Sequence, residues 1–374
     1  MGVAAIIMAG GRGERFWPAS RADRPKQFLA FHGGRTLLQQ TVDRLAGLVE
    51  TKNLWIITRE DYAHLVYQQV PEVPRSRVLL EPEGRDTAPC IALATLHVAR
   101  TNPDAVTVVL PADHLVVQEE RFREALRAAA ELASRGDRLV TLGIRPTRPE
   151  TAYGYIEIGP PVEASGAYHA YSVRGFTEKP PRERAIAYLQ RGGFYWNSGI
   201  FVWRVSAILS ALREHMPGLM ARLEPLARAI GTEQEAEELR RIYPTLPRLS
   251  IDYGVMERAR NTLMIPADFG WDDLGTWAAL ERVLPADEDG NVLSGRVLAV
   301  DTRGSVVQGH GERLVATFGV SDLVVVDSRD AVLIADKHRV GELKAVVGRM
   351  EAEGLRDHLL TAPRSETDRA GQWG

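Results

Sequence analysis

The 374-residue sequence is poor in cysteine, in lysine and in long apolar runs. Its one cysteine, Cys90, cannot form an internal disulfide, which is typical of a protein in a reducing cytoplasm. No apolar run approaches the roughly 18 residues that a membrane-spanning helix requires, and the first residues lack the basic start of a secretory signal. The formal charge of −3 disfavours a protein that coats nucleic acid or an anionic membrane. We therefore expect a cytoplasmic enzyme without a nucleic-acid or membrane partner.

Lysine is scarce in a chain that is rich in arginine. Only five of the 46 lysines and arginines are lysines, and two of these, Lys26 and Lys179, lie in the densest motifs described below. A lysine ammonium is a compact point charge, whereas an arginine guanidinium is a planar fork. Lysine at these two positions indicates that a point charge is needed there. The alternative is that the two lysines occur at these positions by chance.

The first two thirds of the sequence predict an α/β domain. VAAIIM (3–8), LWIIT (54–58) and VTVVL (106–110) are apolar runs typical of buried strands, and helical patterns such as 120–134 and 182–191 lie between strands. This alternation predicts a doubly wound, mixed but mostly parallel sheet. Residues 219–241, which are rich in Glu and Arg, are interpreted as a helical surface insertion.

The pattern changes after Pro285. Five short β segments, separated by Gly, Asp and Asn, predict a small β-helix-like module that ends in a helix over 340–350. We expect a catalytic domain over 1–284, the module with its helix over 285–361, and a flexible tail over 362–374. The apolar face of the terminal helix could have either of two partners. It could pack on its own module, or it could pair with a second copy of the chain in a homodimer.

The glycine-rich segment AGGRGERFWPASRADRPKQF (9–28) carries the strongest local signal. Glycines directly after a strand let the backbone approach a polyphosphate, and Arg12, Arg15 and Lys26 can neutralise its charge. The segment is neither a dinucleotide-binding fingerprint, because Phe16 stands where the third glycine should be, nor a P-loop, because Gly-Lys-Ser/Thr is absent. A tight turn without a ligand is the alternative.

Acidic residues occur at two further places. Asp113 in PADH (111–114) follows a buried strand, and GWDDLGTW (270–277) contains Asp272 and Asp273. A carboxylate at the end of a parallel strand is well placed to hold Mg²⁺ near a polyphosphate, although aspartate also caps helices. Zinc motifs and nucleophile elbows are absent, which disfavours zinc and covalent catalysis.

In two further motifs, polar residues are flanked by apolar ones. They are FTEKP (176–180) and WNSGIF (196–201), in which Glu178 and Asn197 can bind sugar hydroxyls and Lys179 can meet a sugar phosphate. Taken singly, each motif is also common in surface turns and loops.

In this order, the motifs resemble those of the mannose-1-phosphate guanylyltransferase family. The resemblance runs from about residue 3 to 277 and rests on AGGRGERFWPASRADRPKQF, EPEGRDTAP, PADH, FTEKP, WNSGIF, SIDYGVMER and GWDDLGTW. It extends more weakly through DLVVVDSRDAVLIAD (322–336). It implies a Rossmann-like nucleotidyltransferase domain with a β-helix-like C-terminal module. Long members of the family add a phosphomannose isomerase domain, and that activity is not expected here.

The resemblance also implies the site residues and the reaction, in which GTP and mannose-1-phosphate give GDP-mannose and pyrophosphate. Arg15 and Lys26 are the implied catalytic residues, and Mg²⁺ is the implied cofactor, held by Asp113 and by Asp273 rather than Asp272. The residues implied for the nucleotide are Gly10, Gly11, Gly13, Glu81, Arg85, Asp86 and Thr87. Those implied for the sugar phosphate are Gly154, Glu178, Lys179 and Asn197.

Base recognition departs from the family pattern at one position, because the family usually has Asn where this chain has Asp86. Two alternative functions stay open at this point. One is a nucleotidyltransferase for another pair, such as glucose-1-phosphate with UTP or dTTP, and the other is a non-catalytic regulatory homologue that binds GDP-mannose.

Overall fold

The computed structural model describes residues 2–11, 13–31 and 33–361, so the predicted tail 362–374 and Arg12 lie outside the described residues. The chain divides into two compact units. The first comprises Met1–Gly10 with Leu38–Asp273, and the second comprises Gly11–Leu37 with Leu274–Gly374. The chain thus leaves the first unit directly after Gly10 and re-enters it at Leu38. The predicted domain boundary near residue 284 stays a prediction.

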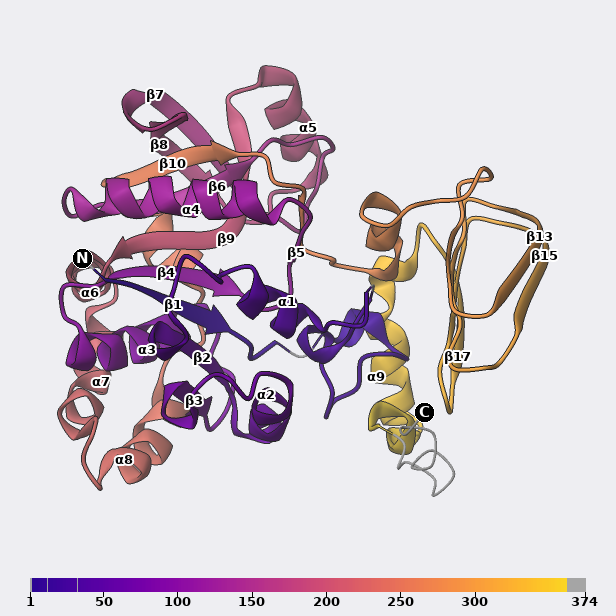
Figure 1. Cartoon of the computed structure of the whole chain (residues 1–374), viewed down its shortest axis with the longest axis horizontal. Coiled ribbons are helices and arrows are strands. Elements are labelled where there is room, and N and C mark those ends of the chain that lie inside the picture. Colours follow the sequence, from indigo (N-terminus) through magenta and orange to yellow (C-terminus); the bar gives the residue numbers. More distant parts are fainter. Residues whose placement is uncertain (1, 12, 32, 362–374) are drawn as a thin grey trace. The chain divides into compact units, whose positions relative to one another are not determined.

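The first unit is built on a large mixed sheet, which confirms the expected α/β fold (Figure 1). Strands β1 (Val3–Met8), β2 (Leu54–Arg59), β3 (Val78–Glu81) and β4 (Val106–Pro111) are parallel to one another, and β6 (Leu139–Ile144) is parallel to β10 (Thr262–Ala267). Strand β9 (Phe194–Arg204) lies between β4 and β6 and is antiparallel to both. In spatial order, the strands are β3 (Val78–Glu81), β2 (Leu54–Arg59), β1 (Val3–Met8), β4 (Val106–Pro111), β9 (Phe194–Arg204), β6 (Leu139–Ile144), β10 (Thr262–Ala267), β8 (Tyr168–Thr177) and β7 (Tyr155–Ser165).

The apolar runs of the sequence form the buried strands. Val106 to Leu110 of β4 are all buried, as their continuous apolar character predicts. Helix α4 (Glu119–Ser134) lies over β6 and β9 (Figure 1) and buries Phe122, Leu126 and Leu132, whose spacing places them on one helical face. The α-helices of this unit are α1 (Leu37–Asp43, which begins at the boundary), α2 (Ala63–Gln69), α3 (Thr87–Thr101), α4 (Glu119–Ser134), α5 (Arg182–Arg191), α6 (Val205–His215), α7 (Pro217–Ala229) and α8 (Glu235–Ile242).

The prediction that residues 219–241 form a surface insertion is wrong. Leu219, Leu223 and Leu226 of α7 are buried in the main hydrophobic core, together with residues of α3 and α6. Their spacing puts one apolar face on an otherwise charged helix, and this face packs inward. Tyr243, just after α8, is fully buried as well. The segment is therefore part of the core of the first unit.

The second unit contains the β-helix-like module, as predicted. Strands β12 (Val292–Ser294), β14 (Val306–Gln308) and β16 (Leu323–Asp327) stack in parallel register, with Val292, Val306 and Val324 aligned across the ladder. Strands β13 (Val297–Arg303) and β15 (Val315–Ser321) form a second parallel pair, while β17 (Val332–Asp336) returns antiparallel to β16. Helix α9 (Lys344–Ala352) follows this module.

Short helical elements complete both units. In the second unit they are η1 (Glu14–Phe16), η2 (Lys26–Phe28), η8 (Trp277–Arg282), η9 (Val340–Glu342) and η10 (Arg356–Leu359). In the first unit they are η3 (Thr51–Asn53), η4 (Glu60–Tyr62), η5 (Arg75–Arg77), η6 (Tyr243–Thr245) and the π-helical turn η7 (Asp252–Met256). Within the described residues, no helix combines the length and the apolar character needed to cross a bilayer.

Candidate active site

The glycine-rich segment in the second unit folds back on itself. Ser20 Oγ donates to the carbonyl oxygen of Gly13 (2.7 Å), and Gln27 Nε2 donates to that of Gly11 (3.0 Å). Gly13 has a φ of 61°, and a Cβ there would lie 2.6 Å from both Cβ and N of Lys26. Only glycine fits this position, because the left-handed backbone and the close approach of Lys26 both exclude a side chain.

The two predicted catalytic residues lie on short helical turns of this segment. Arg15 is half-buried in η1, whereas Lys26 begins η2 with only 5% of its surface exposed. The Lys26 ammonium is 5.7 Å from the centroid of the Phe16 ring. An ammonium in such partly desolvated surroundings interacts more strongly with an anion than it would in water.

The predicted nucleotide residues Gly10 and Glu81 are neighbours in the first unit. A Cβ on Gly10 would lie 2.9 Å from Glu81 Oε2, so the two residues are in close contact. The Glu81 carboxylate is buried at the end of β3 and accepts a hydrogen bond from the hydroxyl of Tyr243. Burial raises the pKa of Glu81 to about 7. Such a carboxylate is suited to accept a hydrogen bond from an N–H group that approaches it.

Residues 85–87 are engaged in contacts within the first unit. Arg85 donates to the carbonyl oxygens of Leu246 (3.2 Å) and Pro244. Asp86, at a φ of 68°, precedes α3 and accepts from the backbone N–H of Thr87 (2.7 Å). The hydroxyl of Thr87 in turn accepts from the N–H of Ile251 (2.8 Å). These bonds give the three side chains a visible structural role, and their contact with a base stays a prediction.

The two predicted metal ligands flank two short strands that pair with each other. Strand β5 (Leu115–Val116) pairs antiparallel with β11 (Trp271–Asp272), and Asp272 is opposite Leu115. This pairing places Asp113, two residues before β5, and Asp273, directly after β11, at the same end of the two-stranded ladder. Trp271 Nε1 donates to His114 Nδ1 (3.2 Å) and further joins the two segments. Two sequence motifs that are about 160 residues apart are thus adjacent.

The donors present there fit a hard divalent cation. Asp273 accepts a hydrogen bond from the hydroxyl of Tyr153, and His114 Nε2 is 3.8 Å from Asp113 Oδ1. Burial, followed by the charge of Asp273, raises the pKa of Tyr153, so this hydroxyl stays a donor. No group of three or more His, Cys, Asp or Glu in the described residues is arranged to hold a metal ion. Two carboxylates with the remaining positions left for water and phosphate oxygens suit Mg²⁺.

The predicted sugar-phosphate residues gather in the first unit around Gly154. A Cβ there would be 2.5 Å from Glu178 Oε2 and 3.3 Å from Asn197 Cβ. Lys179 Nζ pairs with Glu178 Oε1 (2.8 Å). The structure therefore brings together three of the four residues by direct approach and the fourth through an ion pair.

The side chain of Asn197 is oriented by three hydrogen bonds. Its Nδ2 donates to Asp252 Oδ1 (2.9 Å), and its Oδ1 accepts from Gly199 N (3.2 Å) and Thr141 Oγ1 (3.4 Å). Burial, followed by the charge of Glu178, raises the pKa of Asp252 to about 7. Of the amide's hydrogens, one is engaged with Asp252, so a sugar hydroxyl that meets this group would accept from the other.

The residues that support the site have little signal in the sequence. Tyr243 holds Glu81, Asp252 holds Asn197, and Tyr153 holds Asp273. Only Asp252 had a signal, because it lies within the motif SIDYGVMER, to which no role was assigned. The other two act through contacts between segments that are far apart in the sequence.

The fold and the family comparison agree. The sequence profile described as Nucleotidyl transferase matches residues 4–290, and the one described as MannoseP isomerase/GMP-like beta-helix domain matches residues 295–350. The chain is thus a nucleotidyltransferase. A solved structure from Thermus thermophilus, described as a mannose-1-phosphate geranyltransferase, has a TM-score of 0.84 and 43% identity over 94% of this chain and 100% of its own.

Two further relatives indicate which family of nucleotidyltransferases this is. Mannose-1-phosphate guanylyltransferase ManC of Salmonella typhimurium strain LT2 is 42% identical over 95% of this chain and 74% of its own length. Xanthan biosynthesis protein XanB of Xanthomonas campestris pv. campestris is 38% identical over 94% of this chain and 74% of its own. The chain belongs to the mannose-1-phosphate guanylyltransferase family and is an enzyme.

Proposed function

We propose that this enzyme transfers the GMP moiety of GTP to mannose-1-phosphate and releases GDP-mannose and pyrophosphate. Membership of the family supports this reaction, and the pairing of β5 with β11, which brings Asp113 and Asp273 to one end of a ladder, is the observation that carries it. A phosphate oxygen of mannose-1-phosphate attacks the α-phosphorus of GTP in line, and the bond from that phosphorus to the pyrophosphate breaks. The attacking oxygen is already anionic at neutral pH, so neither a general base nor a covalent intermediate is needed.

The protein's task in this reaction is to position two anions and to offset their repulsion. Two unit charges 4 Å apart repel by about 4 kcal/mol at an effective dielectric constant near 20. The backbone N–H groups at Gly10, Gly11 and Gly13 are proposed to bind the triphosphate, and Arg15 and Lys26 to neutralise it. Glu81, Arg85, Asp86 and Thr87 are proposed to lie at the base.

Mg²⁺ is proposed as the cofactor, with Asp113 and Asp273 as its ligands. When bound, it supplies positive charge to the phosphate oxygens. Tyr153 orients Asp273 through its hydroxyl. On the sugar side, Glu178 and Asn197 are proposed to hold the mannose hydroxyls, Lys179 is proposed to meet the phosphate, and Gly154 is proposed to lie close to the ring.

The test is a panel of nucleoside triphosphates and sugar-1-phosphates, read by pyrophosphate release in the presence of Mg²⁺. We expect GTP with mannose-1-phosphate to give the highest kcat/KM. Preference for glucose-1-phosphate with UTP or dTTP would replace the proposal by a related nucleotidyltransferase activity. Binding of GDP-mannose without any turnover would instead indicate a regulatory homologue.

Two further properties belong to this proposal. The enzyme is proposed to act in the cytoplasm, which is consistent with the buried, unpaired Cys90. It is also proposed to form a homodimer through its C-terminal module, since this module exposes large apolar side chains to solvent, Leu298, Phe318 and Ile334 among them.

A further inference from the structure

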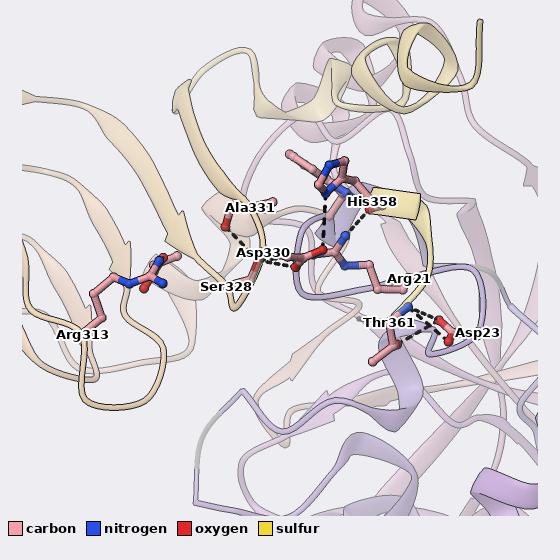
Figure 2. Close-up of polar contacts among 10 residues, drawn as sticks. Arg21, Asp23, Arg313, Ser328, Asp330, Ala331, His358 and Thr361 are labelled. Carbon is pink, nitrogen blue, oxygen red and sulfur yellow. Dashed lines mark hydrogen bonds and ion pairs between the residues drawn. The ribbon is translucent and has the colours of Figure 1, made fainter. Parts of the chain in front are cut away.

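A buried arginine joins the glycine-rich segment to the C-terminal module of the same unit. Arg21 lies between Arg15 and Lys26 in the sequence, and only 5% of its side chain is exposed. Its Nη2 pairs with Asp330 Oδ1 (2.7 Å) and donates to Ser328 Oγ (3.3 Å), and its Nη1 donates to the carbonyl oxygen of His358 (Figure 2). One side chain therefore contacts both the turn after β16 and the segment after α9.

Further hydrogen bonds attach the same stretch to the end of the described chain. The N–H of Ala22 donates to the carbonyl oxygen of Leu359 (2.8 Å), and Trp17 Nε1 donates to that of His358 (2.9 Å). The carboxylate of Asp23 accepts from both N and Oγ1 of Thr361, each at 2.9 Å (Figure 2). These contacts cover residues 17–23, directly between the two predicted catalytic residues.

An aromatic contact holds the start of the segment. Trp277 at the beginning of η8 donates through Nε1 to the carbonyl oxygen of Trp17 (3.1 Å), and its ring centroid is 5.1 Å from that of Phe16. Three parts of the C-terminal chain, namely Trp277, the turn 328–330 and residues 358–361, thus support residues 16–23. Within the segment itself, the side chains of Ser20 and Gln27 also donate hydrogen bonds to the backbone, as noted above.

We propose that the C-terminal module positions the phosphate-binding segment, with Arg21 and Asp330 as the positioning pair. The inference rests on the proposed function, in which Gly11, Gly13, Arg15 and Lys26 bind the triphosphate. Arg21 fixes the backbone between Arg15 and Lys26, and Asp330 supplies the negative charge that makes burial of the guanidinium favourable. The module is then a working part of nucleotide binding as well as a surface for association.

Loss of the pair has a specific expected effect. Asp330→Asn keeps the shape of the side chain but removes the carboxylate that is paired with the buried guanidinium, and it also removes the carboxylate oxygen that is 3.5 Å from His358 Nδ1. The segment then samples other conformations, which reduces the fraction of enzyme that is ready to bind GTP. We expect the KM for GTP to rise about tenfold, equal to about 1.4 kcal/mol of lost binding, while the KM for mannose-1-phosphate stays unchanged.

The chain offers a matched control three residues away. Asp327 is also a buried carboxylate of the module, with 2% of its side chain exposed, and it pairs with Arg313 of the same module (2.7 Å). Asp327→Asn removes a buried charge from the same strand-and-turn region but leaves the contacts of Arg21 in place. Thermal unfolding of both variants measures their general loss of stability.

The deciding measurement is hydrogen exchange of the full-length protein, read on peptides that cover residues 13–28. We expect faster exchange there in Asp330→Asn than in Asp327→Asn or wild type, together with the selective rise in the KM for GTP. Arg21→Lys keeps the charge, but its single ammonium nitrogen replaces the two nitrogens that bond to Asp330 and to the His358 carbonyl oxygen. It should therefore show the same changes to a smaller extent. It serves as the test variant if Asp330→Asn does not fold.

Equal exchange and an equal KM for GTP in Asp330→Asn and Asp327→Asn would overturn the proposal. So would a rise of both Michaelis constants in proportion to lost thermal stability, since that would indicate a merely structural role. Failure of the proposed function has a different signature, because wild-type enzyme would then release no pyrophosphate from GTP and mannose-1-phosphate. The exchange measurement would still decide whether the module holds the segment.

Discussion

At the scale of single residues, Lys26 belongs to a residue type that is rare in this chain, and its side chain is buried. It is one of five lysines in the chain, and it is almost fully shielded beside Phe16 and Gly13. Substitution of Lys26 by Ala should lower kcat by at least about 100-fold, since each factor of ten corresponds to about 1.4 kcal/mol of barrier. Lys26→Arg should also be impaired, because a planar fork does not fit the space of a point charge. Steady-state turnover at saturating Mg²⁺ measures both effects, and near-native turnover of Lys26→Ala would remove this lysine from the mechanism.

Asp113 gives a second test of charge at the site. Asp113→Asn keeps the size of the side chain but removes the negative charge proposed to hold Mg²⁺. Turnover should fall by two or more orders of magnitude, about 2.8 kcal/mol or more of barrier, and the Mg²⁺ concentration for half-maximal rate should rise. Titration of the rate with Mg²⁺ separates these effects. Unchanged activity across that titration would contradict the assignment of Asp113 as a ligand.

Glu81 makes the stability of the protein depend on pH. Because burial raises its pKa to about 7, folded Glu81 retains a proton that the unfolded chain releases above its ordinary pKa near 4.5. The free energy of unfolding should therefore fall as the pH rises from about 4.5 to about 7, by up to about 1.4 kcal/mol per pH unit from this group. Glu81→Gln should remove that contribution. Denaturant unfolding across this range tests it, and parallel curves for the two proteins would refute the idea.

At the scale of elements, the sugar-phosphate region depends on the missing side chain of Gly154. Ala at this position would put its Cβ 2.5 Å from Glu178 Oε2, so the carboxylate proposed to grip mannose must move. The KM for mannose-1-phosphate should rise about tenfold or more, a loss of at least about 1.4 kcal/mol, with little change in the KM for GTP. Gly175→Ala in β8 is the control, because its Cβ would have only ordinary contacts at 3.8 Å or more. Equal kinetics of the two variants would count against a sugar at this place.

Local patterns predicted most of the elements. Helix α5 has the predicted bounds, and the apolar runs at 54–58 and 106–110 became β2 and β4, because their side chains determine both conformation and burial. The interpretation of 219–241 failed because its Glu and Arg content masked three leucines on one face. The ladder of β5 and β11 could not be predicted, since two-residue strands leave no periodicity to detect. The same limit applies to Tyr153 and Tyr243, whose partners are far away in the sequence.

At the scale of the whole molecule, the proposed homodimer depends on apolar side chains of the module. Phe318 on β15 is 78% exposed, and Leu298 and Val300 on the paired strand β13 are exposed as well. Phe318→Asp should convert a dimer into a monomer without loss of fold, because the side chain makes no contribution to the core. Light scattering coupled to size-exclusion chromatography measures the mass. A monomeric wild type, or a dimer that tolerates the charge, would refute the use of this face.

The order in which the chain visits its two compact units has a practical consequence. Residues 11–37 leave the first unit after β1 and join the C-terminal chain, so neither unit is a continuous stretch of sequence. In a chimera that takes only the C-terminal module from a relative, Arg21 of this chain would face the relative's turn and carboxyl-terminal segment in place of its own partners. Such hybrids should regain function only when residues 11–37 and the module are exchanged together, because the two segments form one compact unit.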